Sequence, residues 1–306
     1  MKRYPVIITL FFFLNIFFCC GIATGSDYLN FYEINVEAES SNHTLIATAK
    51  FTIKSITEEG IKFFLNEKAK ITELKLNGDI KNYKGELREN SLYGKAGYEV
   101  EIEIPQDIKK SSSYVILELK YTAAFDKKPE KPKFSREFIS DEALGYIGEE
   151  GTFLSPSALW YPVMEGGKDF AYKINITSGK GYEYITAGDR IRREEKGDKI
   201  ITSFQFLNPA EEIFLVGGKY KISEGRYNDV KIYTYFFPED EDLSDGYIES
   251  VKNYLKLYEG LLGRYPFGQF SVVSNFLPTG YGFPTFTLLG QEILRLPFIK
   301  DTSLGH

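Results

Sequence analysis

YVILELKY, residues Tyr114 to Tyr121, alternates apolar and polar side chains along its length. In an extended chain, Val115, Leu117 and Leu119 lie on one face, and Glu118 and Lys120 lie on the other. Alternation with a period of two is typical of a β-strand that buries one face and exposes the other. The segment therefore predicts a half-buried strand, and its neighbours decide what kind of sheet it joins.

Three further segments, 98–104, 170–176 and 199–206, follow the same period of two. Turn-forming residues separate such runs, as in Asn77-Gly78-Asp79. The 25 Phe and 22 Tyr residues also favour strands, because aromatic side chains suit half-buried pleated surfaces. We therefore expect a mainly β fold, with an antiparallel saddle-like or sandwich-like domain over residues 26–225.

The pattern changes near residue 240. From Tyr247 to Gly263, apolar side chains recur at every third or fourth position, which is typical of an amphipathic helix with one face on a core. One set of these side chains is Tyr247, Val251, Tyr254, Tyr258 and Leu261, and a second is Ile248, Leu255 and Leu262. A second domain of α+β type is expected over residues 226–306, in keeping with a length of 306 residues.

The N-terminus resembles an export signal. Two basic residues precede an apolar run, and the small residues Ala23 and Gly25 stand before Ser26. Residues 1–25 are therefore predicted to be a signal peptide, which implies a periplasmic, extracellular or membrane-anchored protein. An uncleaved membrane anchor is the alternative, since the run approaches the length of a span. Cleavage would remove Cys19 and Cys20, the two cysteines of the chain.

The formal net charge is −6, and the lysines are interleaved with acidic residues along the predicted strands. Nucleic-acid binding requires clustered Lys and Arg, so we expect no nucleic-acid partner.

Three motifs follow one another along the chain. Trp160-Tyr161-Pro162 holds the single tryptophan, Tyr265-Pro266-Phe267-Gly268 follows the predicted helix, and Gly280 to Pro284 form a glycine- and proline-rich loop before a short apolar strand. Glycine permits close approach of another backbone, although a tight turn explains such a loop equally well.

In this order, the motifs resemble those of the membrane alanyl aminopeptidase family, the gluzincin zinc metallopeptidases that include leukotriene hydrolase. The resemblance implies a saddle-like β domain followed by a thermolysin-like catalytic domain. It also implies a peptide or protein substrate that binds along Gly280, Tyr281, Gly282, Phe283 and Pro284. The family's zinc helix, with its H-E-x-x-H motif, follows shortly after this loop.

His306 falls where that motif would begin, so the resemblance makes it the first zinc ligand. A catalytic zinc needs about three protein ligands and an open position for water, and in H-E-x-x-H the glutamate acts as general base. We therefore expect the 306 residues to be an inactive N-terminal part of a zinc metallopeptidase. The coding sequence should then continue with Glu, two other residues and His.

One residue departs from the family pattern. Family aminopeptidases carry G-x-M-E-N in the glycine loop, and the glutamate grips the free amine of the substrate; Phe283 stands in its place here. The resemblance therefore supports a metallopeptidase better than an aminopeptidase. A non-enzymatic, exported, β-rich binding or scaffold module is the alternative function.

Overall fold

The computed structural model describes residues 29–54, 60–129, 145–166, 169–278 and 280–296. The predicted signal peptide and His306 lie outside these residues. No helix within these ranges is long and apolar enough to cross a membrane.

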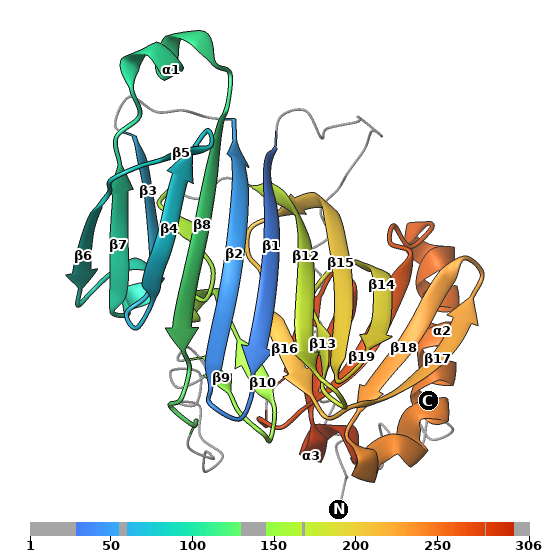
Figure 1. The fold of residues 1–306 in the computed structure, drawn as a ribbon. Helices are drawn as coiled ribbons and strands as arrows, with labels where there is room; N and C mark the ends of the chain where they lie inside the picture. The colour runs from blue at the N-terminus through green and yellow to red at the C-terminus, as the bar shows by residue number, and fades with distance from the viewer. Residues whose placement is uncertain (1–28, 55–59, 130–144, 167–168, 279, 297–306) are drawn as a thin grey trace, which may run out of the picture.

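The largest element is an eight-stranded sheet that forms the broad face of the molecule (Figure 1). Its neighbours pair antiparallel, except that β1 and β12 run parallel. In order across the sheet, the strands are β14 (Asp189–Lys196), β15 (Lys199–Ala210), β12 (Phe170–Gly179), β1 (Asn30–Glu39), β2 (Thr44–Ile53), β8 (Val115–Ala124), β4 (Lys70–Leu76) and β5 (Asp79–Ile80).

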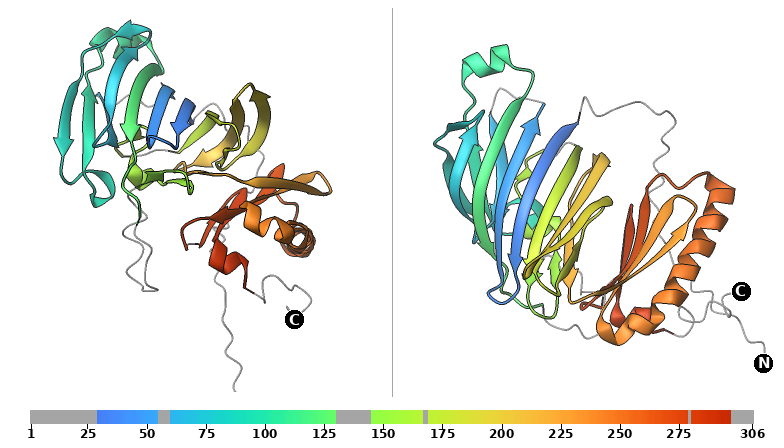
Figure 2. Two further views of the ribbon diagram at one scale, coloured as in Figure 1. Left: turned by 60° about the horizontal axis from the view of Figure 1, so that its bottom comes forward. Right: turned by 45° about the vertical axis from the view of Figure 1, so that its right-hand side comes forward.

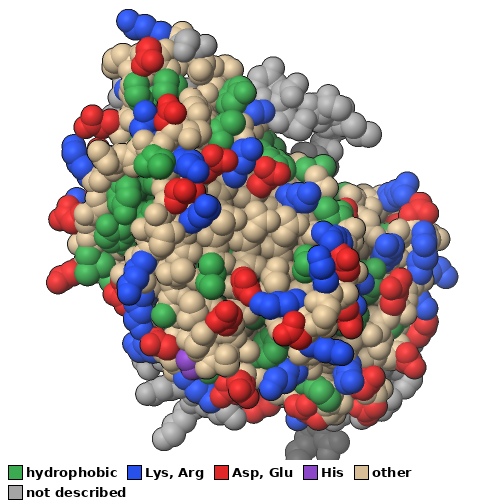
Figure 3. Space-filling model, viewed as in Figure 1, with side chains coloured by type: hydrophobic (Ala, Val, Ile, Leu, Met, Phe, Trp, Pro, Cys, Tyr) green, Lys and Arg blue, Asp and Glu red, His purple; other side chains and the backbone are tan. Residues whose placement is uncertain are grey.

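Strand β8 contains the opening stretch, and its burial alternates as its sequence predicts. Val115, Leu117 and Leu119 are at most 2% exposed, whereas Lys120 is exposed. The other three predicted strands are confirmed as β7, β12 and β15. The apolar side of the sheet faces the core, and the other side carries basic and acidic side chains intermingled (Figure 3). The prediction of a mainly β fold is therefore confirmed.

Two four-stranded sheets lie beside the large one. The first consists of β13 (Glu183–Ile185), β16 (Leu215–Gly218), β10 (Thr152–Leu154) and β9 (Tyr146–Ile147). The second consists of β11 (Val163–Met164), β3 (Ile61–Asn66), β7 (Gly97–Ile102) and β6 (Lys84–Arg88). Short helical segments connect the strands: η2 (Leu92–Gly94), α1 (Gln106–Ser111) and η4 (Pro156–Ala158).

A five-stranded sheet follows, with β17 (Lys221–Tyr227), β18 (Val230–Phe236), β19 (Gln269–Asn275), β21 (Phe286–Gly290) and β20 (Gly280–Phe283) in that order. η5 (Pro238–Leu243) leads into α2 (Ser244–Leu262), and α3 (Gln291–Leu294) follows β21. α2 covers one face of this sheet, and the opposite face adjoins the core of the large sheet (Figure 2). The sheets divide between Gly218 and Lys221, so position 225 lies inside β17.

Helix α2 differs in one respect from the expectation. Tyr247, Ile248, Val251 and Leu255 are buried, but the other predicted members of the apolar face are 47% to 69% exposed: Tyr254, Tyr258, Leu261 and Leu262. At about 3.6 residues per turn, Tyr258 and Leu262 continue the direction of the buried face. Their exposure therefore means that the last turns of α2 extend past the strands that cover its first half.

Candidate functional site

The glycine-rich segment forms an edge strand. Gly280–Phe283 is β20, the outermost strand of the five-stranded sheet, and within the described residues it pairs with β21 alone. Pro284 and Thr285 form the two-residue turn between them, because Phe283 is paired with Phe286. An edge strand presents main-chain N–H and C=O groups that another extended chain can pair with.

The register shows which backbone groups face outward. In a hairpin with a two-residue turn, the residues that flank the turn exchange hydrogen bonds, and the pairs then alternate along the strands. Phe283 and Tyr281 therefore bond towards β21, whereas the N–H and C=O groups of Gly280 and Gly282 face the free edge. Both glycines are exposed, and a Cβ on either would meet no atom of the described chain within 4 Å.

The two non-glycine side chains of β20 point to the other face and join an aromatic cluster. The Phe283 ring stacks on Phe286 with centroids 4.2 Å apart, and it lies 4.7 Å from the Phe214 ring. The Tyr281 ring lies 5.8 Å from Phe153 and 6.0 Å from Phe214. Phe214, Tyr281 and Phe283 are half-buried, so the cluster keeps an apolar surface beside the free edge.

The tryptophan motif fixes one wall of this cluster. The fully buried Trp160 donates its indole N–H to the carbonyl oxygen of Ile213 at 3.0 Å. The amide of Ile213 donates to the hydroxyl of Tyr161 at 3.2 Å. Both backbone groups of Ile213 are thereby held, and the next residue is Phe214. The Trp160-Tyr161 corner is thus a packing element that places an aromatic ring against β20.

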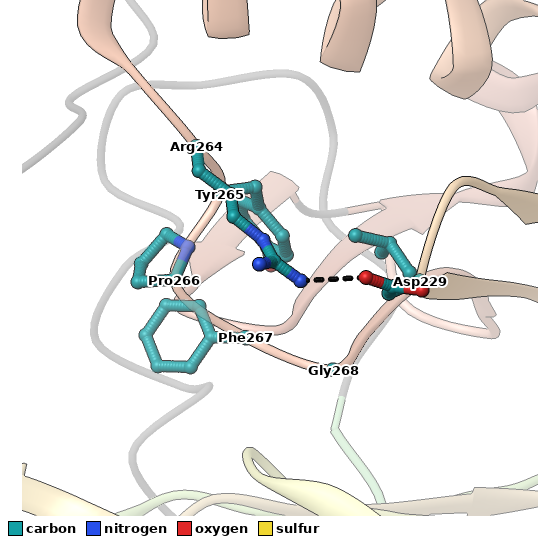
Figure 4. A pocket seen from close by; sticks show the side chains of 7 residues that line it. Asp229, Arg264, Tyr265, Pro266, Phe267 and Gly268 are labelled. Carbon is teal, nitrogen blue, oxygen red and sulfur yellow. Dashed lines mark hydrogen bonds and ion pairs between the residues drawn. The ribbon is translucent and has the colours of Figure 1, made fainter.

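The Tyr265-Pro266-Phe267-Gly268 turn lies beside the Pro284-Thr285 turn of the hairpin. The Tyr265 hydroxyl donates to the carbonyl oxygen of Pro284 at 2.7 Å. Burial raises the pKa of Tyr265 well above its ordinary value, so the hydroxyl remains a donor at neutral pH. The hollow beside this turn contains an exposed ion pair between Arg264 and Asp229 at 2.8 Å (Figure 4).

The described residues do not supply a metal centre. Across these ranges, no three His, Cys, Asp or Glu side chains gather where they could hold a metal ion. His43, the other histidine, faces the carbonyl oxygen of Ile147 through Nδ1. The predicted ligand, His306, lies outside the described residues, so the structure does not place it relative to Gly280–Pro284.

The sequence analysis singled out Gly280 to Pro284 but none of the aromatic residues that contact β20 from other segments. Phe153 and Phe214 come from segments more than 60 residues away in the chain, and neither belongs to a motif. Thr285, which follows the glycine segment, was missed as well. Phe214 does directly precede a buried apolar run, Leu215 and Val216, but that feature is common to many core strands.

Neither a protein-family model nor a curated protein matches the sequence. Solved structures do match. An M1 zinc metallopeptidase from Deinococcus radiodurans, a variant bound to the substrate Tyr-Ser-Ala, superposes with a TM-score of 0.61 at 11% identity. The match covers 89% of this chain and 62% of that one. Native yeast LTA4 hydrolase superposes with a TM-score of 0.61 at 11% identity, over 87% of this chain and 41% of that one.

These matches establish the fold. The described part of the chain is folded like part of an M1 zinc metallopeptidase, and the chain spans less than two thirds of the length of either protein. The similarity to the aminopeptidase and leukotriene hydrolase fold, inferred from the three motifs, is therefore confirmed.

Proposed function

We propose that this chain is the N-terminal part of an exported zinc metallopeptidase and that β20 binds the backbone of its peptide substrate. The observation that carries the proposal is the exposed edge at Gly280 and Gly282, set beside an aromatic surface in a metallopeptidase-like fold. A peptide in extended conformation adds to such an edge through main-chain hydrogen bonds, and side-chain pockets then give specificity.

The residues of this chain would perform two tasks. Gly282 would pair its N–H and C=O groups with the substrate backbone, and the missing side chains at Gly280 and Gly282 allow the substrate to approach closely. The rings of Phe214, Tyr281 and Phe283 would contact an apolar or aromatic side chain of the substrate. No carboxylate stands at position 283, so this strand offers no ion pair to a free α-amine.

The described residues do not form a site for the zinc that the fold implies. Of the two histidines, only His306 is a candidate ligand, and one imidazole is fewer than the roughly three protein ligands of a catalytic zinc. We propose that the 306-residue chain binds peptides without hydrolysing them.

The test measures peptide binding by the full chain. Tyr-Ser-Ala and its N-acetylated form serve as probes, followed by ligand-observed NMR. Gly282→Pro removes the outward-facing N–H, which an edge strand tolerates structurally. Losing about one backbone hydrogen bond should weaken binding about tenfold. Gly282→Ala keeps the N–H and has space for its Cβ, so it serves as the matched control.

The proposal is supported if the unaltered chain and Gly282→Ala bind alike and Gly282→Pro binds more weakly. Equal binding by all three would place the peptide away from β20. Binding without dependence on Gly282, together with hydrolysis, would contradict both parts of the proposal.

A further inference from the structure

The turn that ends β20 is held by hydrogen bonds from three separate parts of the chain. The Tyr265 hydroxyl donates to the carbonyl oxygen of Pro284 at 2.7 Å. The amide of Ser271, in β19, donates to the carbonyl oxygen of Thr285 at 2.9 Å. The amide of Gly188, which lies just before β14 of the large sheet, donates to the Thr285 hydroxyl at 2.9 Å.

The bond from Gly188 joins the hairpin to the β domain, and it is buried. Thr285 is 1% exposed, so water cannot replace the Gly188 amide as its partner. Gly188 has φ +114°, and a Cβ there would lie 2.5 Å from the carbonyl oxygen of Gln205. This backbone conformation is open to glycine and strained for other residues. The position of the donor is therefore fixed by the large sheet.

Tyr265, whose hydroxyl forms the second bond to the turn, is itself held in place by neighbouring residues. The Tyr265 ring packs edge-on against Phe267 and Phe270, with centroids 5.4 and 6.2 Å away. Its hydroxyl also lies 3.4 Å from the carbonyl oxygen of Gln269, the first residue of β19. The phenol is thereby held at the start of β19, and the shorter of its two hydrogen bonds is the one to the turn.

We infer that Tyr265 and Thr285 are positioning residues for the peptide-binding edge. This inference rests on the proposed function. Neither side chain lies on β20, and both hold the turn from which β20 extends. A β20 strand of four residues has few bonds of its own, so its distance from the aromatic cluster depends on how the turn is held. Removing either hydroxyl would let the free edge of β20 shift relative to the ring of Phe214. Substrate binding requires this edge and this ring to keep their relative positions.

The experiment separates positioning from overall stability. Tyr265→Phe and Thr285→Val each remove one hydroxyl with little change of shape, Thr285→Ser restores the hydroxyl, and Tyr258→Phe is a matched control on the exposed part of α2. The dissociation constant of N-acetyl-Tyr-Ser-Ala is measured by NMR on the full chain, at a temperature where the fluorescence of Trp160 shows every variant to be folded.

We expect Tyr265→Phe and Thr285→Val to raise the dissociation constant about tenfold, comparable with the loss of one hydrogen bond at the site. Thr285→Ser and Tyr258→Phe should bind like the unaltered chain. A lower melting temperature with an unchanged dissociation constant would show that the two hydroxyls act on stability alone, and it would overturn the inference. If the unaltered chain bound no peptide, the proposed function would fail first, and the inference with it.

Discussion

The ring of Phe283 lies 4.7 Å from the ring of Phe214, and this contact joins the proposed peptide-binding edge to the β domain. Phe214 is placed there because Trp160 and Tyr161 hold the backbone of Ile213. One surface thus combines the backbone edge and rings of β20 with Phe153 and Phe214, which come from the segments before the five-stranded sheet.

The charge at position 283 should set the preference for the substrate's N-terminus. We expect the unaltered chain to bind free and acetylated Tyr-Ser-Ala with similar affinity, because a phenyl ring forms no ion pair. Phe283→Glu should favour the free amine by about tenfold, as charge-assisted hydrogen bonds are about twice as strong as neutral ones. Phe283→Gln is the neutral control. A strong preference for the free amine in the unaltered chain would mean that another acidic group grips it.

The 306-residue chain should bind zinc no more tightly than a peptide with one histidine. His306 is one candidate ligand. His43, the other histidine, faces the carbonyl oxygen of Ile147. Calorimetric titration with zinc, with His306→Ala as control, measures the affinity. Sub-micromolar binding that disappears in His306→Ala would contradict this prediction.

The β domain should fold without the five-stranded sheet. β17 pairs with β18, so a chain that ends at residue 225 carries most of a strand without its partner. We expect residues 26–219 to unfold in one cooperative transition and to show a β-type circular dichroism spectrum. Adding residues 220–225 should not raise the melting temperature. A gradual melt of both fragments would refute independent folding.

The ion pair between Asp240 and Arg295, which joins η5 to the end of α3, should stabilise the region around the five-stranded sheet. Arg295 donates to Asp240 through Nη2 at 3.0 Å and through Nε, and the Asp240 side chain is 2% exposed. Arg295→Met leaves this buried carboxylate with Gln291 as its one remaining side-chain donor among the described residues, and it should cost about 2 kcal/mol of unfolding free energy. Urea unfolding followed by Trp160 fluorescence measures the change.

Arg264→Met provides the comparison for that measurement. The Arg264–Asp229 pair is about three quarters exposed on both sides, and such pairs contribute about 0–1 kcal/mol. We therefore expect Arg264→Met to lower the free energy of unfolding only slightly. Equal destabilisation by the two substitutions would show that burial of Asp240 is not the cause.

The sequence predicted the strands well, and it singled out the segment that forms β20 but not the rings that lie beside it. Alternation of apolar and polar residues in segments such as Tyr114–Tyr121 indicates directly which face is buried. The local sequence pattern was therefore enough to predict strands such as β8. The parallel pairing of β1 with β12 did not, because the two strands are about 140 residues apart and nothing in their local sequences encodes the partner. The glycine segment was expected as a loop, since glycine is enriched in turns and depleted in strands.

The aromatic wall shows the same limit. Phe153, Phe214 and Phe283 come together through three separate segments of the chain, and each alone resembles an ordinary core residue. For α2, the period of 3.6 gave the face that is buried but not its extent. Exposure of Tyr258 and Leu262 depends on where the covering strands end, which is a tertiary property.

Amide hydrogen exchange in β20 tests the central claim most directly. The amides of Gly280 and Gly282 face the free edge, whereas those of Tyr281 and Phe283 face β21. With saturating N-acetyl-Tyr-Ser-Ala, we predict that exchange at Gly280 and Gly282 slows, with the larger effect at Gly282, and that Tyr281 and Phe283 change little. Unchanged exchange at both glycines under saturation, with protection appearing elsewhere in the chain, would show that the peptide does not add to this edge.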